Sequence, residues 1–553
     1  MAATGLTASD PFRPFPGVRP YRTGEDLLFG GRADESSRVA ELWRTKPLTV
    51  VYGPPGTGKS SLLHAGVVPR LRALGSNVLP IGMVARGPVS PEAAAPSSNP
   101  FVRTLLRTWA PGASLPPTAI RRFLRDAGRL SAPVLVAVDQ AEDLFRGDRA
   151  GERRELLGEL TAAPRVNLLL CVRDDRFATL LSELGHPPAE VARFALGGLP
   201  PASAVEAVRR PLEGTGRMIS TAVAEALVEE LLTVRLVDEI GGRTQERLPA
   251  VVPWHLQVVC ARIWEAWPAG RRTLTEDRLP DVNDALQDGI WAAVGAVAGS
   301  FERDPARLAR WLARTFISPA GAARAVDGPS AETAGVPAMV LDALVDRFVL
   351  RVRTTDDGTP AYTPQSDRLL EPLGRLAERV GTVEPPPLGP ADQLRAAADA
   401  LADGDYARAD RGARQAAATA SRDLRLRIDA QTMLGNNAFA RGDLAMAQDA
   451  YQRAVMLLET RQDQEAVGAM LAAIGRLSLE RGDLAGGLGL LRSAVARLPA
   501  DRVIKTELAR ALADAGEPAA AAAMLGSMMT AAEDDDARIL HGRIRAQLAQ
   551  RPG

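Results

Sequence analysis

The 553-residue chain contains very few cysteines and histidines. Cys171 and Cys260 are 89 positions apart, and the four histidines are scattered without the spacing of metal ligands. These absences argue against a disulfide framework and against a zinc site. The formal net charge is zero, so no overall field attracts the chain to nucleic acid or to an acidic membrane surface.

Long apolar stretches are also missing. No run approaches the roughly 20 residues that span a bilayer, and the first residues lack the charged and apolar regions of a signal peptide. We therefore expect a cytoplasmic protein. Lysine is rare, occurring only at Lys46, Lys59 and Lys505, and arginine supplies the other basic residues. Against this background, which looks like a high-GC coding bias, the lysine at position 59 is informative.

The chain is too long for one hydrophobic core, and its pattern predicts a multidomain protein of the α/β plus α class. Residues 1–20 form a proline-rich arm. Residues 21–200 alternate β-prone apolar runs with helical stretches, which predicts a doubly wound domain with a parallel sheet. Residues 201–295 have helical periodicity and almost no strand signal. Residues 296–381 combine helices with two short strands around a turn, which fits a winged helix.

A proline-rich linker at 382–390 precedes a helical region over 391–553. A turn signal recurs in this region at spacings of 38, 40 and 34 residues: Gly404-Asp405, Gly442-Asp443, Gly482-Asp483 and Gly516-Glu517. The period and the paired helices predict four repeats similar to tetratricopeptide repeats, stacked as an α-solenoid. A plain helical bundle is the alternative. A solenoid would offer a concave face to a peptide or a protein.

The strongest functional signal is a loop between an apolar strand and a helix. It matches the full Walker A pattern of a P-loop: Gly53, Pro54, Pro55, Gly56, Thr57, Gly58, Lys59 and Ser60. The glycines allow backbone N–H groups to turn toward a phosphate. Lys59 would bridge the β- and γ-phosphates, Ser60 would ligate Mg²⁺, and Ser61 is counted with the loop. We predict a site for ATP/ADP, or for a guanine nucleotide, with Mg²⁺.

Acidic residues follow the apolar run Val134 to Val138. Asp139 ends this run and is the predicted Walker B carboxylate, which would hold the metal shell. Because Gln140 occupies the position where a water-polarising acid is usual, Glu142 or Asp143 are the candidates, and we favour Glu142. The alternative for Glu142 is an acid that stabilises a helix N-terminus.

Arg173 ends the next apolar strand, at the edge of the sheet where a γ-phosphate would lie. It is the best candidate for an arginine that senses this phosphate. The alternative is a salt bridge to Asp174 or Asp175.

These motifs, taken in order, resemble the STAND class of signal-transducing P-loop NTPases, specifically the bacterial subgroup called novel STAND NTPase 1. The similarity covers roughly residues 12–375. The matching segments are Phe15 to Tyr21, Phe29 to Glu35, Gly53 to Leu71, Val138 to Phe145, Arg173 to Phe177, Pro253 to Cys260 and Phe316 to Gly321. The resemblance implies that Phe29 and Arg32 lie near the adenine and that Arg173 is the sensor arginine.

The resemblance also implies a switch. In this class the nucleotide-binding domain, helical domain and winged helix close over ADP, and a ligand on the C-terminal repeats releases them to exchange nucleotide and oligomerise. One departure concerns Ser366, which stands where the family tends to have a histidine that touches the ADP phosphate. The ADP-locked state therefore does not carry over directly.

The leading hypothesis is an ATP-dependent switch that senses a protein or peptide trigger through its repeats. It would assemble with copies of itself or recruit a separate effector, as in bacterial conflict or antiphage defence. A separate effector is expected because the predicted segments leave no length for an effector domain. One alternative is a DNA-binding transcriptional regulator, weakened by Asp356-Asp357 in the wing and by the lack of a terminal helix-turn-helix unit. Another is a scaffold that binds nucleotide without hydrolysis, which Gln140 and Ser366 leave open.

Overall fold

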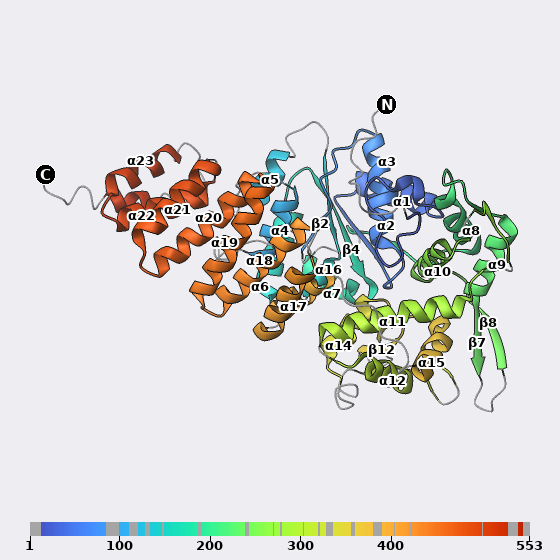
Figure 1. Cartoon of the computed structure of the whole chain (residues 1–553). Helices are drawn as coiled ribbons and strands as arrows, with labels where there is room; N and C mark the ends of the chain where they lie inside the picture. Colours follow the sequence, from blue (N-terminus) through green and yellow to red (C-terminus); the bar gives the residue numbers. More distant parts are fainter. Residues whose placement is uncertain are drawn as a thin grey trace, which may run out of the picture. The chain divides into compact units, whose positions relative to one another are not determined.

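The computed structural model describes most of the chain, and its helices and strands are shown in Figure 1. The described residues are 13–84, 99–109, 120–127, 133–145, 149–185, 190–237, 243–268, 270–276, 279–301, 303–318, 321–327, 336–354, 360–379, 390–402, 404–420, 423–499, 501–528 and 540–545. Among them, no helix has both the length and the apolar character needed to cross a membrane. The chain folds into two compact units, which are described separately.

A five-stranded sheet in the order β2-β3-β4-β1-β5 organises the first α/β region. In the middle of the sheet, β4 (Val166–Arg173) pairs in parallel with β1 (Leu48–Gly53) on one side and with β3 (Val134–Asp139) on the other. The two remaining strands are β5 (Ala192–Ala195), parallel to β1, and β2 (Gly82–Met83). The apolar runs of the sequence correctly predicted β1, β3 and β4.

Helices cover both faces of this sheet. On one face, Val39 and Trp43 of α1 (Ala33–Thr45) pack with Val51 of β1 and with the helical segment after the Walker A loop. On the other face, the Tyr52 ring stacks on Phe177 of α7 (Asp174–Leu184) at a centroid distance of 3.8 Å. Neighbouring residues of β1 thus point to opposite faces, and the prediction of a doubly wound sheet is confirmed.

The helical segment after the loop is interrupted by a π-helical turn. It begins as α2 (Lys59–Ser61), continues as the π-helix η2 (Leu62–Val67) and ends as α3 (Val68–Ala73). Pro69 lies at the start of α3 and has no N–H to donate, so a regular helix would meet its ring at the preceding turn. The π-turn accommodates this proline while the apolar face stays buried.

The region 201–295 contains more strand than predicted. Its main helices are α8 (Pro201–Arg209), α9 (Thr221–Leu232), α10 (Pro253–Glu265) and α11 (Val282–Ser300). Its strands are β6 (Met218–Ile219) with β9 (Thr273–Leu274), and β7 (Thr233–Val237) with β8 (Arg243–Arg247). The prediction of almost no strand was wrong: Thr233 to Val237 alternates polar and apolar residues, but this short alternation directly follows α9.

The region 296–381 packs on these helices through one shared core. It contains α12 (Pro305–Phe316), α14 (Ala338–Asp346) and α15 (Leu370–Arg379), with the short helix η8 (Asp367–Leu369) before α15. A three-stranded sheet has the order β10-β12-β11, formed by β10 (Val326–Asp327), β12 (Pro360–Pro364) and β11 (Leu350–Thr354). The predicted hairpin is therefore present, although Asp356-Asp357 at its turn lies outside the described residues.

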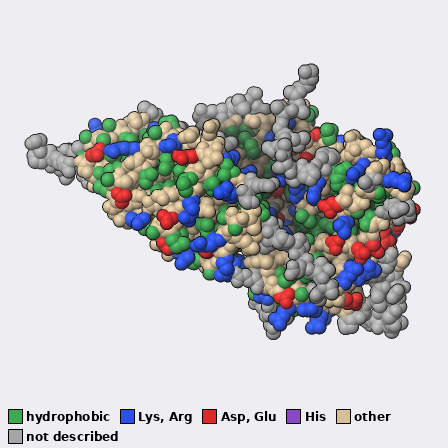
Figure 2. Space-filling model, viewed as in Figure 1, with side chains coloured by type: hydrophobic (Ala, Val, Ile, Leu, Met, Phe, Trp, Pro, Cys, Tyr) green, Lys and Arg blue, Asp and Glu red, His purple; other side chains and the backbone are tan. Residues whose placement is uncertain are grey.

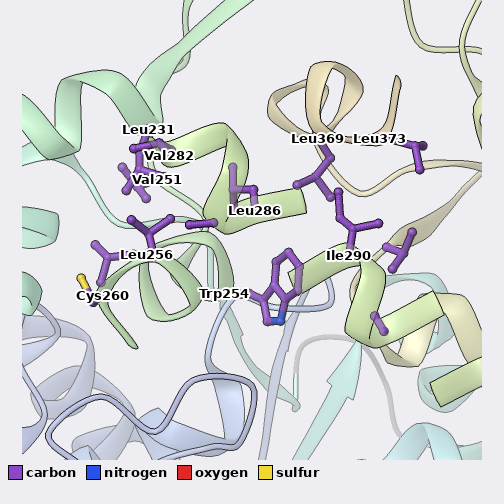
Figure 3. Packing of buried hydrophobic residues seen from close by; sticks show 14 of the residues in the cluster. Leu231, Val251, Trp254, Leu256, Cys260, Val282, Leu286, Ile290, Leu369 and Leu373 are labelled. Atoms are coloured by element: carbon purple, nitrogen blue, oxygen red, sulfur yellow. The ribbon is translucent and has the colours of Figure 1, made fainter. Parts of the chain in front are cut away.

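Figure 3 shows part of this shared core. Trp254 of α10, Leu286 and Ile290 of α11, and Leu369 and Leu373 beyond β12 are all buried in it. Phe15 of the N-terminal arm belongs to the same cluster. Apolar area removed from water contributes roughly 25 cal/mol per Å², so this core holds the arm and the two regions together.

The C-terminal region consists of paired helices. The pairs are α16 (Pro390–Ala402) with α17 (Tyr406–Thr419), α18 (Leu424–Ala440) with α19 (Leu444–Thr460), α20 (Gln464–Glu480) with α21 (Leu484–Arg497), and α22 (Arg502–Asp514) with α23 (Pro518–Met528). These pairs confirm the prediction of an α-solenoid. The linker at 382–389 lies outside the described residues.

The recurring glycine makes the turn within each pair, and an aspartate follows it in the first three pairs. Gly442 and Gly482 adopt φ values of 76° and 85°, a left-handed conformation that costs glycine little. The side chains of Asp443 and Asp483 then accept hydrogen bonds from the backbone N–H groups of Met446 and Gly486, which caps the second helix. The recurring Gly-Asp pair in the sequence therefore marks a turn, made by the glycine, and a helix N-cap, made by the aspartate.

The compact unit that contains the repeats also includes residues 82–129 and 143–164. Within these residues lie α4 (Pro100–Trp109), α5 (Ile120–Ala127) and α6 (Ala150–Thr161). Asn99 fixes the start of α4, because its Oδ1 accepts from Phe101 N while its Nδ2 donates to the Glu152 carbonyl and to Glu155. Most of the predicted surface loop before Pro100 lies outside the described residues.

Charged side chains of both signs are interspersed on the face of the molecule shown in Figure 2. This mixture agrees with the zero formal net charge of the chain. On this face no continuous basic band covers the described residues, and such a band is what phosphate-backbone binding would need.

Candidate nucleotide-binding site

The Walker A loop joins β1 to α2 and is held by several backbone contacts. Gly53 can carry no side chain, because a Cβ there would lie 2.2 Å from the Leu196 carbonyl oxygen. Thr57 is buried, and its Oγ1 donates to the Pro54 carbonyl at 2.8 Å. The loop is thus closed on itself beside the edge of the sheet.

Gly56 and Gly58 adopt φ values of 80° and 85°. Only glycine adopts this left-handed conformation readily, and it turns successive N–H groups toward one side of the loop. Gly56 is also tightly surrounded, since a Cβ would lie 3.2 Å from the Trp254 Cβ and 3.6 Å from the Phe348 ring. The glycines therefore serve both the conformation of the loop and its close packing.

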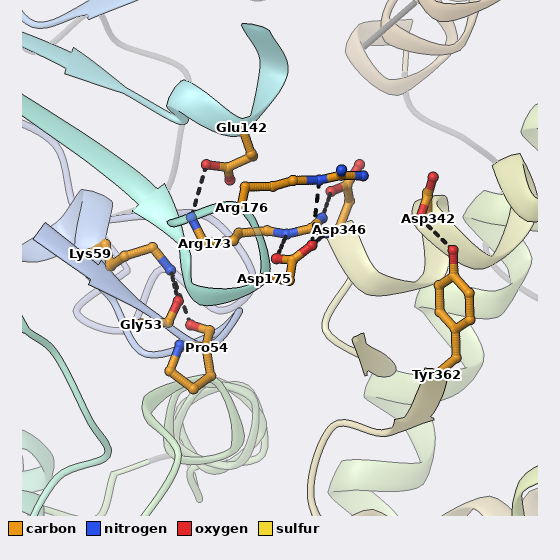
Figure 4. Close-up of polar contacts among 10 residues, drawn as sticks. All are labelled: Gly53, Pro54, Lys59, Glu142, Arg173, Asp175, Arg176, Asp342, Asp346 and Tyr362. Carbon is orange, nitrogen blue, oxygen red and sulfur yellow. Dashed lines mark hydrogen bonds and ion pairs between the residues drawn. The ribbon is translucent and has the colours of Figure 1, made fainter. Parts of the chain in front are cut away.

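The half-buried side chain of Lys59 turns its ammonium group back to the loop, as Figure 4 shows. Its Nζ donates to the carbonyl oxygens of Gly53 at 2.7 Å and Pro54 at 3.0 Å. Burial lowers the pKa of Lys59, while the negative charges of Glu142 and Asp174 act in the opposite direction. A half-buried cation with only carbonyl partners in its loop is suited to a phosphate.

Two predicted acids lie at the same edge of the sheet. Asp139 ends β3, is buried, and its Oδ1 accepts from the Gln140 N–H at 2.9 Å. Gln140 has a φ of 56°, an uncommon value for a residue other than glycine and one that often marks functional sites. Glu142 Oε2 accepts from the Arg173 N–H at 3.3 Å, so this carboxylate reaches the end of β4. Asp143 is also buried.

Arg173 lies opposite Gly53 in the pairing of β4 with β1. Its guanidinium binds Asp175 through two hydrogen bonds and binds Asp346 of α14 through a third. Burial alone would lower the pKa of Arg173, but these partners raise it above its ordinary value. In this structure Arg173 forms the salt bridge to Asp175 that the sequence offered as the alternative to a phosphate-sensing role. Its second partner, Asp346, was not predicted.

Phe29 and Arg32 lie on the other side of the loop, before and at the start of α1. Arg32 is buried, pairs with Glu35, and its Nη2 donates to the carbonyl oxygens of Thr57 at 3.3 Å and Gly197 at 2.6 Å. The Phe29 ring makes an edge contact with Tyr21 at 5.7 Å between centroids. Arg32 therefore borders the loop, whereas Phe29 lies beside Tyr21 and near Gly66 of the following helical segment. The adenine contact of both residues stays a prediction.

Ser60 follows Lys59 at the start of α2, and no metal-ligating cluster of histidine, cysteine and carboxylate groups occurs among the described residues. Ser61 Oγ accepts from the Tyr21 N–H at 3.2 Å, which ties the N-terminal arm to this helix. The roles of Ser60 and Asp139 toward Mg²⁺ stay predictions.

The segment after β12 also reaches the loop. Gln365 is buried, and its Nε2 donates to the Pro55 carbonyl at 3.1 Å. Ser366 instead caps η8, because its Oγ accepts from the Arg368 N–H. The contact to the loop is thus made by Gln365, beside the position where the family tends to have a histidine.

Sequence reasoning missed Phe348 and Gln365 as neighbours of the loop and Asp346 as a partner of Arg173. They come from α14 and from the ends of β11 and β12, far along the chain. The motif at Pro253 to Cys260 and the departure at Ser366 were the only signals that this part of the chain approaches the loop.

Comparison with known proteins identifies the family. The sequence model described as Novel STAND NTPase 1 matches residues 14–359, which is more than half of the chain. The chain belongs to the novel STAND NTPase 1 family. The family match includes the Walker A loop, Asp139, Arg173 and Asp346. A search of curated proteins gave no significant match.

Several solved structures resemble this STAND protein at low identity. A Walker-type ATPase of Pyrococcus abyssi is 19% identical, covering 65% of this chain and 99% of its own, with a TM-score of 0.39. A STAND protein with a tetratricopeptide repeat sensor from Pyrococcus horikoshii is 12% identical, covering 97% and 86%, with a TM-score of 0.30. The ORC2 protein of Aeropyrum pernix is 14% identical, covering 63% and 94%, with a TM-score of 0.32.

Proposed function

We propose that this STAND-family protein is an ATP-dependent switch. It binds ATP or ADP with Mg²⁺ at the Walker A loop and hydrolyses ATP slowly. Its repeats bind a protein or peptide trigger, and the activated protein assembles with further copies and recruits a separate effector. A role in bacterial defence is one setting for such a switch.

The observation that supports the proposal most is the convergence of Lys59, Asp139, Glu142 and Arg173 at one edge of the sheet. β1, β3 and β4 are neighbours, so their carboxyl ends meet there. Lys59 is half-buried and has the charges of Glu142, Asp174 and Asp139 around it. One cation and several carboxylates around a glycine-rich loop are the donor set for a nucleotide with its metal.

In the proposed site each residue has one task. The backbone N–H groups from Gly56 to Ser60 and the Lys59 ammonium would hold the phosphates, while Ser60 and Asp139 would hold Mg²⁺ and its water shell. Mg²⁺, when bound, would neutralise phosphate charge. Glu142 would orient and deprotonate a water. Glu142 is favoured over Asp143, since its charge acts on Lys59 and its oxygen reaches β4.

The region 296–381 supports the assignment as a switch. Its α12, α14, α15 and three-stranded sheet have the composition of a winged helix, and we propose that it is one. Gln365 donates to Pro55 and Phe348 packs near Gly56, so this region contacts the loop directly. A conformational change in the Walker A loop would therefore act directly on the region 296–381 through these two contacts.

Single-turnover hydrolysis tests the proposal. Glu142→Gln keeps the shape of the side chain and removes its charge, so we expect hydrolysis about 100-fold slower with ATP affinity retained. Asp143→Asn is the matched control and should change the rate less. Light scattering of the full chain in ATP and in ADP measures assembly. Absence of hydrolysis in the wild-type protein would favour the scaffold, and a larger effect of Asp143→Asn would reassign the acid.

A further inference from the structure

Arg173 is held by two carboxylates that come from distant parts of the chain. Its Nε and Nη2 donate to the two oxygens of Asp175 at 2.8 Å and 2.6 Å, and its Nη1 donates to Asp346 Oδ1 at 2.9 Å. Asp175 follows two residues after the arginine, whereas Asp346 is the last residue of α14. Figure 4 shows both carboxylates directed at one guanidinium.

This arrangement is largely shielded from water. The side chains of Arg173, Asp175 and Asp346 are 8%, 9% and 23% exposed. If one charged group of such a buried set is removed, the charges of the others are no longer fully compensated. The pairing therefore constrains the orientation of the Arg173 guanidinium. In this structure the guanidinium is committed to carboxylates.

The backbone of Arg173 nevertheless lies beside the phosphate loop. Arg173 is opposite Gly53, the first residue of the loop, and its N–H donates to Glu142, the proposed catalytic acid. A guanidinium pairs equally well with the planar edge of a carboxylate or with phosphate oxygens. Arg173 can therefore bind either the Asp346 carboxylate of α14 or a phosphate of the nucleotide.

We propose that Asp346 is a specificity-determining residue that competes with the terminal phosphate of ATP for Arg173. This inference rests on the proposed function of the site. ADP lacks the γ-phosphate, which is the terminal phosphate of ATP, and therefore leaves the Arg173–Asp346 pair intact. ATP binds with full affinity only when the pair opens, so the pair lowers the affinity for ATP and not for ADP.

Opening the pair also frees the end of α14. Directly after Asp346 the chain turns at Phe348, whose φ is 63°, and places its ring near Gly56. Asp346 and Phe348 thus attach the same turn to the sheet edge and to the loop. When the Asp346–Arg173 contact is lost, only the packing of Phe348 holds this turn. Binding of the γ-phosphate would in this way change the position of α14.

The test compares two nucleotides on the full-length protein. Calorimetry measures the dissociation constants of ADP and of a slowly hydrolysed ATP analogue, both with Mg²⁺, for the wild type and for Asp346→Asn. We expect the analogue to bind about tenfold more tightly to the variant, with the ADP affinity changed less than twofold. Asp346→Ser removes the same charge and gives a second variant if the amide is not accommodated.

Asp342→Asn is the matched control, because Asp342 lies one helical turn earlier on α14 and accepts from the Tyr362 hydroxyl at 2.9 Å. It should not change the ratio of the two affinities. The gain in Asp346→Asn must also disappear when Arg173 is replaced by glutamine, since no guanidinium is then released.

Three results would overturn the inference: an unchanged ratio in Asp346→Asn and Asp346→Ser, an equal change for both nucleotides, or a gain that persists with Arg173→Gln. The proposed function fails separately, if the wild-type protein binds neither nucleotide. Circular dichroism melting of each variant distinguishes a loss of selectivity from a loss of fold.

Discussion

The nucleotide site and the repeats are stabilised by contacts of very different range. At the nucleotide site, Gln365 bonds to Pro55 across 310 positions and Arg173 bonds to Asp346 across 173. In the repeats, Tyr451 bonds to Asn436 across 15 positions and Arg481 to Gln448 across 33. The site therefore depends on several parts of the chain at once, whereas each repeat depends on its neighbours.

The long-range contacts at the nucleotide site can transmit a change in the loop to distant regions of the chain. A contact that spans hundreds of positions depends on the arrangement of whole regions. Gln365 bonds to Pro55 of the phosphate loop, the Phe348 ring lies near Gly56, and Asp346 bonds to Arg173 at the adjacent sheet edge. A repeat distributes its contacts along the solenoid, so one substitution should have a local effect.

The largest effect is expected at Lys59. Lys59→Ala removes the one cation inside the loop whose ammonium contacts Gly53 and Pro54, and we expect nucleotide affinity to fall by more than about 100-fold. Lys46→Ala is the matched control, because Lys46 is exposed before β1 and should bind nucleotide normally. Calorimetry measures both, and unchanged ATP binding by Lys59→Ala would contradict the assignment of the site.

Much of this contrast was predictable from the sequence. The Walker A loop is local, because glycines and a lysine at fixed spacing after an apolar run define both its shape and its chemistry. The repeats were predictable for a related reason, since Gly442-Asp443 and Gly482-Asp483 are each a turn and a cap within a few residues.

The contacts that join regions were not predictable. Asp346 is the last residue of an amphipathic helix, and nothing in its neighbourhood shows that it reaches Arg173. Gln365 drew attention only through Ser366 beside it. The hairpin of β7 and β8 was missed because its alternation directly follows α9, and only the tertiary structure separates the two elements.

A smaller effect is expected from Gly435 of α18. A Cβ at this position would lie 2.3 Å from the Tyr451 ring, and Tyr451 is fully buried. Gly435→Ala should therefore lower the free energy of unfolding by about 1–3 kcal/mol, while nucleotide affinity stays within twofold. Chemical unfolding followed by circular dichroism measures the first, and calorimetry measures the second.

Gly489→Ala is the matched control for this substitution. It lies within α21, and a Cβ there would meet nothing within 4 Å. It should raise the unfolding free energy of the repeats by up to about 1 kcal/mol, since alanine favours a helix more than glycine does. Loss of nucleotide binding in Gly435→Ala, with the fold intact, would contradict the local character of the repeats.

The smallest effect concerns Asp429 of α18. Burial raises the pKa of its carboxyl to about 6, against the opposing charge of Arg425. A raised pKa means that the charged form is disfavoured in the folded state, so stability is lost as the pH rises from about 4 through about 6. Asp429→Asn does not titrate and should be more stable than the wild type by about 1–2 kcal/mol at pH 8.

Melting temperatures at pH 5 and pH 8 check this prediction. The advantage of Asp429→Asn should be clearly smaller at pH 5 than at pH 8. An advantage of equal size at both pH values would show that the carboxyl is not the source of the effect.

The central claim is that the nucleotide at the Walker A loop is read by the segment from α14 to η8, residues 338–369. Hydrogen exchange of the full-length protein, with ADP and with a slowly hydrolysed ATP analogue in Mg²⁺, tests it most directly. We expect amides of α14 and of the turn at Phe348 to exchange at different rates with the two nucleotides, and we expect Lys59→Ala to remove this difference. Nucleotide-dependent exchange confined to the loop and α2, with residues 338–369 unchanged, would contradict it.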